Sequence, residues 1–130
     1  MKYLLDTHVL LWALSNSPKL TLEIRDIISN DNNEIYVSVI SLWEIAIKHN
    51  IDPDKMPYSA QQIRDYSQRS GFIFLSLSLD NIRIYESLDF INNKDPFDRI
   101  LVTQSESSNI RLITHDEKIK NMNLGNILYF

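Results

Sequence analysis

The feature that most constrains the fold of this chain is a regular alternation between short apolar segments and longer amphipathic ones. The short segments are typical of buried strands, whereas the longer ones carry apolar residues at helical spacing. We expect strands at residues 2–5, 34–38, 72–75, 111–114 and 126–128, and helices at 7–15, 21–29, 41–49, 59–69, 79–90 and 95–107. This order indicates an α/β fold with a mainly parallel central sheet flanked by helices. The 130 residues fit one such unit, so we assign 1–130 to a single domain.

Acidic side chains lie close to the points where the expected strands end. Asp6 follows the first strand and Asp116 follows the fourth. Glu44 lies about one turn into the helix after the second strand, and Asp98 lies at the start of the helix that leads into the fourth. Because functional sites of parallel sheets form beyond the carboxyl ends of the strands, we expect these four carboxylates to lie together.

Each of these acids also has an ordinary structural explanation when it is considered alone. Asp6 and Asp116 suit helix N-caps, Asp98 suits the positive end of a helix, and Glu44 could be a solvated helix residue. Together, however, they repel one another: two charges about 5 Å apart do so by about 3 kcal/mol at an effective dielectric near 20. Such a cluster needs protonation or a bound cation. The chain has no cysteine, and an all-oxygen site suits Mg²⁺ or Mn²⁺.

Four segments of the chain resemble, in the same order, the motifs of PIN domains, most closely those of VapC-type toxins from bacterial toxin–antitoxin pairs. They are Leu4-Leu5-Asp6-Thr7, Ser41-Leu42-Trp43-Glu44-Ile45, Asp95-Pro96-Phe97-Asp98-Arg99-Ile100-Leu101 and Leu112-Ile113-Thr114-His115-Asp116. The resemblance covers essentially the whole chain. It implies a PIN-like fold and a Mg²⁺- or Mn²⁺-dependent endoribonuclease. It further implies a homodimer that a small antitoxin protein holds inactive.

The same resemblance implies roles for individual side chains. The metal ligands and catalytic acids would be Asp6, Glu44, Asp98 and Asp116. Small hydroxyl side chains, which would support these acids or a bound water, stand at Thr7, Ser41 and Thr114.

The third motif contains two acids, Asp95 and Asp98, which require separate interpretations. Asp95 precedes Pro96, and proline is favoured at the first position of a helix. We therefore expect Asp95 to be the N-cap and to have a supporting role. Asp98 falls in the first helical turn and is the acid that we assign to the site.

The charge of the chain does not decide between classes of partner. Seventeen acidic residues against 13 basic ones give a net charge of −4, which by itself argues against contacts with RNA phosphates. If four acids lie under a bound cation, the remaining acids and bases are equal in number. Weak candidates for phosphate contacts are Lys48, Lys94 and Arg99. No signal peptide or membrane-spanning segment is apparent, so we expect a cytoplasmic protein.

The histidines and tryptophans do not form a recognisable metal motif. His8 and His115 neighbour two of the acids, but their spacing matches no zinc site, so packing or substrate contact is the better interpretation. Trp12 and Trp43 have apolar neighbours, which favours a position in the core or in an interface over base stacking.

Three alternative functions remain open from the sequence. PIN-like sites also occur in DNA and flap nucleases. A catalytically inert PIN scaffold would bind RNA or a protein partner without cleavage, although the presence of all four acids favours an enzyme. A phosphatase with an aspartyl nucleophile is disfavoured, because Asp6 is followed by Thr7-His8 without the second aspartate that such enzymes usually carry.

Overall fold

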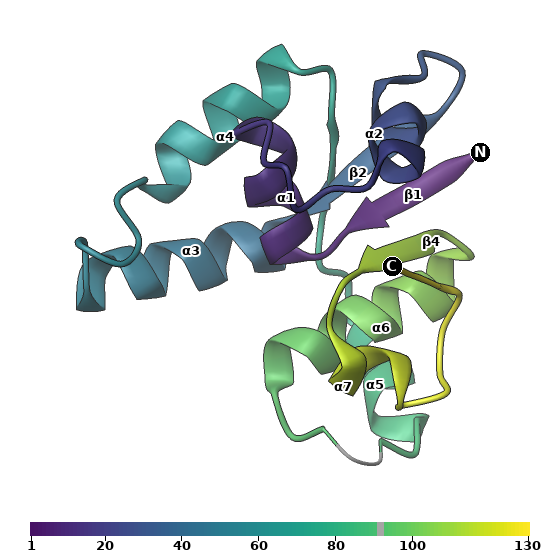
Figure 1. Cartoon of the computed structure of the whole chain (residues 1–130). Coiled ribbons are helices and arrows are strands. Elements are labelled where there is room, and N and C mark those ends of the chain that lie inside the picture. Colours follow the sequence, from purple (N-terminus) through teal and green to yellow (C-terminus); the bar gives the residue numbers. More distant parts are fainter. Residues whose placement is uncertain (91–92) are drawn as a thin grey trace.

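The computed structural model, which describes residues 1–90 and 93–130, has a five-stranded parallel sheet at its centre (Figure 1). The strands are β1 (Lys2–Leu5), β2 (Glu34–Ser38), β3 (Ile73–Leu75), β4 (Arg111–Thr114) and β5 (Ile127–Tyr129). They lie in the order β3-β2-β1-β4-β5, and each neighbouring pair is parallel. The expectation of a mainly parallel sheet is therefore confirmed.

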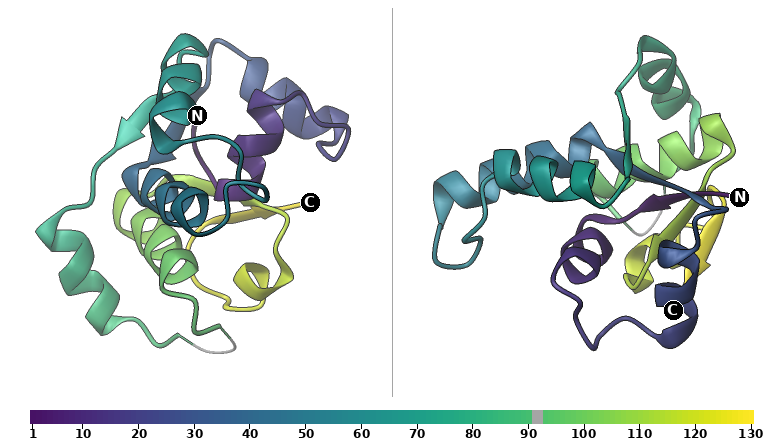
Figure 2. Two further views of the ribbon diagram at one scale, coloured as in Figure 1. Left: turned by 90° about the vertical axis from the view of Figure 1, so that its left-hand side faces the viewer. Right: turned by 90° about the horizontal axis from the view of Figure 1, so that it is seen from above.

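Seven helices connect or follow these strands within the described residues. They are α1 (Thr7–Leu14), α2 (Leu22–Ser29), α3 (Val39–Ile51), α4 (Ala60–Arg69), α5 (Leu79–Ser87), α6 (Pro96–Ser108) and α7 (Glu117–Lys120). The right-hand view of Figure 2 shows α1 and α2 on one face of the sheet and α5 and α6 on the other. The flanking helices predicted from the sequence are confirmed.

Two apolar clusters, one on each face, hold the layers together. In the central strand β1, Tyr3 and Leu5 belong to the cluster under α1 and α2, whereas Leu4 belongs to the cluster under α6 and α7. Leu4 and Leu5 are both fully buried. A strand that is buried on both faces has a continuous apolar sequence, which explains the Tyr3-Leu4-Leu5 run.

Several helix boundaries differ by one to three residues from those expected, and two of the differences have a clear cause. Helix α3 begins at Val39 rather than at 41, because the Ser38 side chain at the end of β2 accepts a hydrogen bond from the Ile40 backbone and caps the helix there. Helix α5 ends at Ser87 rather than at 90, since Leu88 is already extended. In the described part of the chain, no helix has the length and apolarity that a membrane crossing requires.

Candidate active site

The central strands bring two acids from opposite ends of the sequence to one edge of the sheet. Leu5 of β1 pairs with Ile113 of β4, and the Asp6 backbone N–H donates to the Ile113 carbonyl at 3.0 Å. Asp6 and Asp116 therefore emerge next to each other from adjacent strands. They line one cavity of about 270 Å³. Asp6 also caps α1, and Asp116 also caps α7. Each acid is therefore a helix cap and a member of the candidate site at the same time.

A threonine hydroxyl connects Asp6 and Asp116. Thr114 Oγ1 donates to Asp6 Oδ2 at 2.8 Å and accepts from the Asp116 backbone N–H at 3.0 Å. The other Asp6 oxygen, Oδ1, accepts from the Thr7 backbone N–H at 2.7 Å. Asp6 is only 7% exposed and is therefore largely shielded from water. These donors replace the hydrogen bonds that water would make to an exposed carboxylate.

Helix α3 contributes Glu44 to the site, where the hydroxyl groups of Thr7 and Ser41 hold it in place. Thr7 Oγ1 lies 2.8 Å from Glu44 Oε1 and 2.9 Å from the buried Ser41 Oγ. Because a carboxylate only accepts, the Thr7 proton is donated to Glu44 and Ser41 donates to Thr7. The other carboxylate oxygen, Oε2, pairs with the Lys48 ammonium at 2.7 Å. Glu44 is thus fixed from both sides.

Helix α6 and the residues before it position Asp98. Asp95 caps the helix as predicted, since its Oδ1 accepts from the backbone N–H groups of Phe97 and Asp98, at 2.8 and 3.4 Å. The Asp98 carboxylate accepts instead from the Asn93 side chain at 2.9 Å. Asn93 is buried and also accepts from the Asp95 backbone N–H at 2.9 Å. Sequence reasoning missed Asn93, because it lies in an irregular segment that no periodicity marks.

The electrostatics show that the four acids influence one another. Burial, strengthened by the charges of Glu44 and Asp116, raises the pKa of Asp6 to about 6. Burial also raises the pKa of Asp98 to about 7, with further repulsion from Asp95, Asp6 and Asp116. The hydrogen bonds from Thr114 and Asn93 oppose these shifts but do not cancel them. The edge of the sheet therefore carries negative charge that the protein compensates incompletely.

Comparison with protein families matches the PIN domain over residues 3–124, almost the full length of the chain. The chain belongs to the PIN domain family. The resemblance stated from its four motifs is thereby confirmed. The PIN family comprises nucleases, so the match supports this class of enzyme.

Solved structures with the same fold include three VapBC complexes. That of VapBC2 from Rickettsia felis, bound to a promoter DNA fragment, has a TM-score of 0.73 at 20% identity, covering 99% of this chain and 98% of that one. DNA-bound VapBC from Salmonella typhimurium has a TM-score of 0.68 at 13% identity, with the same coverage of both chains. VapBC-1 from nontypeable Haemophilus influenzae has a TM-score of 0.59 at 18% identity, again with 99% and 98% covered. A comparison with curated proteins found no match.

The donor set of this PIN domain fits a hard divalent cation in its chemistry. Asp6, Glu44, Asp98 and Asp116 offer only carboxylate oxygens, which Mg²⁺ and Mn²⁺ prefer. Among the described residues, no group of three or more acidic or histidine side chains is already arranged to hold a metal ion. Lys48 is the one cation in the described part of the chain that forms an ion pair with any of the four acids. A bound cation would compensate the remaining charge of this partly buried carboxylate cluster.

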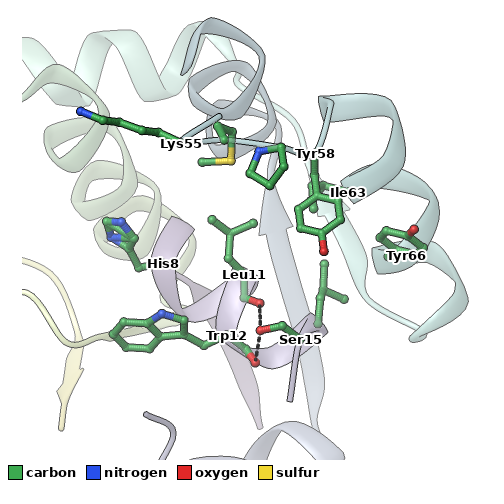
Figure 3. A pocket seen from close by; sticks show the side chains of 11 residues that line it. His8, Leu11, Trp12, Ser15, Lys55, Tyr58, Ile63 and Tyr66 are labelled. Atoms are coloured by element: carbon green, nitrogen blue, oxygen red, sulfur yellow. Dashed lines mark hydrogen bonds between the residues drawn. The ribbon is translucent and has the colours of Figure 1, made fainter. Parts of the chain in front are cut away.

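Two aromatic side chains of this PIN domain have environments that the sequence did not distinguish. Trp43 is 59% exposed and packs edge-on against Phe97 at 5.4 Å, so it does not lie in the core. Trp12 is half-buried and stacks against His8 at 6.1 Å. An apolar cavity of about 380 Å³ lies beside it, between α1 and α4 (Figure 3). Its walls include Leu11, Tyr58, Ile63 and Tyr66.

The cationic side chains considered as phosphate contacts are partly occupied within the protein. The Lys48 ammonium pairs with Glu44, and Arg99 Nε donates to the Asn93 carbonyl at 2.7 Å. The Arg99 guanidinium also lies 5.0 Å from the centre of the Phe90 ring. Both side chains therefore help to position acidic elements of the site.

Proposed function

We propose that this PIN domain is a metal-dependent endoribonuclease and the toxin of a toxin–antitoxin pair. The observation that carries the proposal is that Asp6 and Asp116, which follow β1 and β4, line one cavity and interact electrostatically with Glu44 of α3 and Asp98 of α6. Asp6 and Asp98 have raised pKa values. The hydroxyls of Thr7, Ser41 and Thr114 support the proposal, because all three contact one of these acids or each other. Carboxylates with a purely structural role would gain nothing from lying close enough to repel one another.

Asp6, Glu44, Asp98 and Asp116 would hold Mg²⁺ or Mn²⁺ at the edge of the sheet. Such an ion lowers the pKa of water and stabilises the charge that develops on a phosphodiester. Thr114 and Thr7 would keep Asp6 and Glu44 oriented, since each donates to one carboxylate oxygen. Asn93 would do the same for Asp98, while Asp95 would fix the start of α6.

The decisive experiment is RNA cleavage by the purified chain, freed of any bound partner, with Mg²⁺ or Mn²⁺ and with EDTA. We expect cleavage that EDTA stops and that Glu44→Gln reduces by at least about two orders of magnitude. Glu34→Gln, at an exposed glutamate that begins β2 at the opposite end of the sheet, is the matched control. Metal and RNA binding with no cleavage would favour the inert scaffold instead. Cleavage that persists in Glu44→Gln would contradict the site.

A protein partner follows from the same proposal. The structural neighbours were solved as VapBC complexes, which supports a small antitoxin for this chain. We propose that the antitoxin covers the acidic edge, that the chain forms a homodimer, and that it acts in the cytoplasm. Expressed alone, the chain should slow bacterial growth, and Asp116→Ala should relieve the effect. Unchanged toxicity of Asp116→Ala would mean that another part of the chain is responsible.

A further inference from the structure

The cavity that contains Asp6 and Asp116 has a second wall that the proposed hydrolysis does not use. This wall consists of His8 and Trp12 from α1 and of His115, which directly follows β4. His8 and Trp12 are one helical turn apart, and Figure 3 shows them extending from the same side of α1. Trp12 meets the His115 ring edge-on at 5.6 Å. Three carboxylates, those of Asp6, Asp116 and Glu117, and three aromatic rings thus surround one space.

This aromatic wall is held by the packing of the C-terminal segment. The His115 ring lies parallel to Tyr129 at 6.0 Å and contacts Phe130, and its Nδ1 is hydrogen-bonded to the Phe130 carbonyl. Trp12 also packs edge-on against Phe130, at 6.4 Å. His8 and His115 nevertheless remain exposed. Exposed rings on a fixed backbone offer a ready surface for a planar ligand.

Two lysines lie beside the same wall. Lys19 Nζ is 5.3 Å from the centre of the Trp12 ring, and Lys120 Nζ is 4.6 Å from the centre of the Tyr129 ring. Lys19 thus neighbours a ring of the wall, and Lys120 neighbours Tyr129, which packs against His115. Both ammonium groups offer contacts for phosphates that the carboxylates would repel. Aromatic rings flanked by cations are the combination that binds single-stranded nucleic acid.

We infer that this wall is a binding site for one unpaired base of a single-stranded RNA, adjacent to the phosphate at the acids. The inference rests on the proposed nuclease function. A cavity of about 270 Å³ is near the small end of ligand pockets, a size that suits one base. A paired base would not present both of its faces to such a wall. The larger apolar cavity between α1 and α4 shares His8 and Trp12 with the smaller one, but neither Asp6 nor Asp116 lines it. The smaller cavity includes two of the acids that would act on a phosphodiester, so RNA is favoured over a protein segment as its occupant.

The test uses the fluorescence of Trp12 to report binding at the wall. The chain has two tryptophans, so Trp43→Phe leaves Trp12 as the sole source of tryptophan fluorescence. Asp98→Asn is added to prevent cleavage, and a short single-stranded oligoribonucleotide of mixed sequence is titrated in the presence of Mg²⁺. We expect saturable quenching. The same sugar–phosphate backbone without bases, and the same RNA annealed to its complement, should not quench.

Variants at the exposed His8 separate recognition from folding. His8→Ala should weaken binding at least about fivefold, the scale of losing one stacking contact, whereas His8→Phe should restore most of it. Equal quenching by the abasic backbone, or equal binding by His8→Ala, would overturn the inference. Absence of quenching while the chain with intact acids still cleaves RNA would overturn the base site alone. Failure of both cleavage and binding would overturn the proposed function with it. A Trp12 signal that responds to a protein partner but not to RNA would assign the cavity to that partner.

Discussion

Asp6 and Thr114 are 108 residues apart in the sequence, and a hydrogen bond of 2.8 Å joins their side chains. The bond exists because β1 and β4 are neighbours in the sheet and their last residues emerge at the same edge. It is the principal side-chain donation that opposes the raised pKa of Asp6. The orientation and the pKa of a carboxylate near the start of the chain therefore depend on a hydroxyl near its end.

Removal of this hydroxyl should destabilise the protein in a pH-dependent way. Thr114→Val leaves a buried carboxylate without one donor, which costs about 1–3 kcal/mol of unfolding free energy at pH 8. The loss should be smaller at pH 5, below the pKa of about 6 that Asp6 has in the folded protein. Urea denaturation at both pH values measures it. The matched control is Thr103→Val at a buried threonine whose hydroxyl donates to the Arg99 carbonyl, and its loss should not vary with pH.

The metal-free protein should become less stable as the pH rises from about 4 to about 7. Both Asp6 and Asp98 have pKa values above the ordinary 3.8, so in this range the folded chain binds more protons than the unfolded chain. Calorimetry in EDTA should give a melting temperature several degrees higher at pH 5 than at pH 8. The double variant Asp6→Asn, Asp98→Asn should show a shallower dependence. An unchanged slope in that variant would assign the effect to other groups.

The two acids of the third motif should respond differently to substitution. Asp95→Ala removes a helix cap and should cost about 1 kcal/mol of stability while Mn²⁺ still raises the melting temperature. Asp98→Asn should instead stabilise the metal-free protein, because it removes a half-buried charge that its neighbours repel, and should reduce the response to Mn²⁺ and the cleavage. Thermal denaturation with and without Mn²⁺ distinguishes the two. A metal-insensitive Asp95→Ala with a responsive Asp98→Asn would reverse the assignment.

Lys48 should compete with metal for Glu44. Its ammonium is 2.7 Å from the carboxylate, and its side chain is 47% exposed. Lys48→Met should therefore alter stability by less than about 1 kcal/mol and should tighten Mn²⁺ binding by about two- to fivefold. Isothermal titration calorimetry measures the affinity. Lys2→Met, which removes an exposed pair with Glu34 at the opposite end of β1, should leave it unchanged. Weaker Mn²⁺ binding by Lys48→Met would show that Lys48 supports the metal.

The sequence predicts the strands of this fold because their patterns are local. Tyr3-Leu4-Leu5 is apolar on both faces, as a central parallel strand requires, and Asp95 before Pro96 marks the start of a helix. The four acids could be grouped for the same reason, since the ends of parallel strands share an edge. The i,i+4 spacing of Glu44 and Lys48 could also have revealed their ion pair.

Other parts of the site depend on contacts that no local pattern encodes. Asn93 reaches Asp98 from an irregular segment, and only the folded backbone brings the two together. The cavity beside Asp6 brings α1, which follows β1, together with His115, which follows β4, so its aromatic wall is a product of tertiary packing. Trp43 has apolar neighbours in sequence but lies on the outer side of α3 against Phe97. Adjacent residues on a helix point in different directions, and sequence composition alone does not specify which direction faces solvent.

The position of β4 between β1 and β5 has a consequence for protein synthesis. Until the ribosome has made residues 111–114, β1 lacks one of its two neighbours, and Asp6 lacks both the Ile113 carbonyl and the Thr114 hydroxyl that fix it. Pairing β4 with β1 also closes the long stretch of chain between them into a loop. This closure costs conformational entropy before the strand hydrogen bonds compensate for it. A nascent chain therefore contains three of the four acids without an assembled site. The proposed site is complete only after residues 111–116 have been translated and β4 has paired with β1.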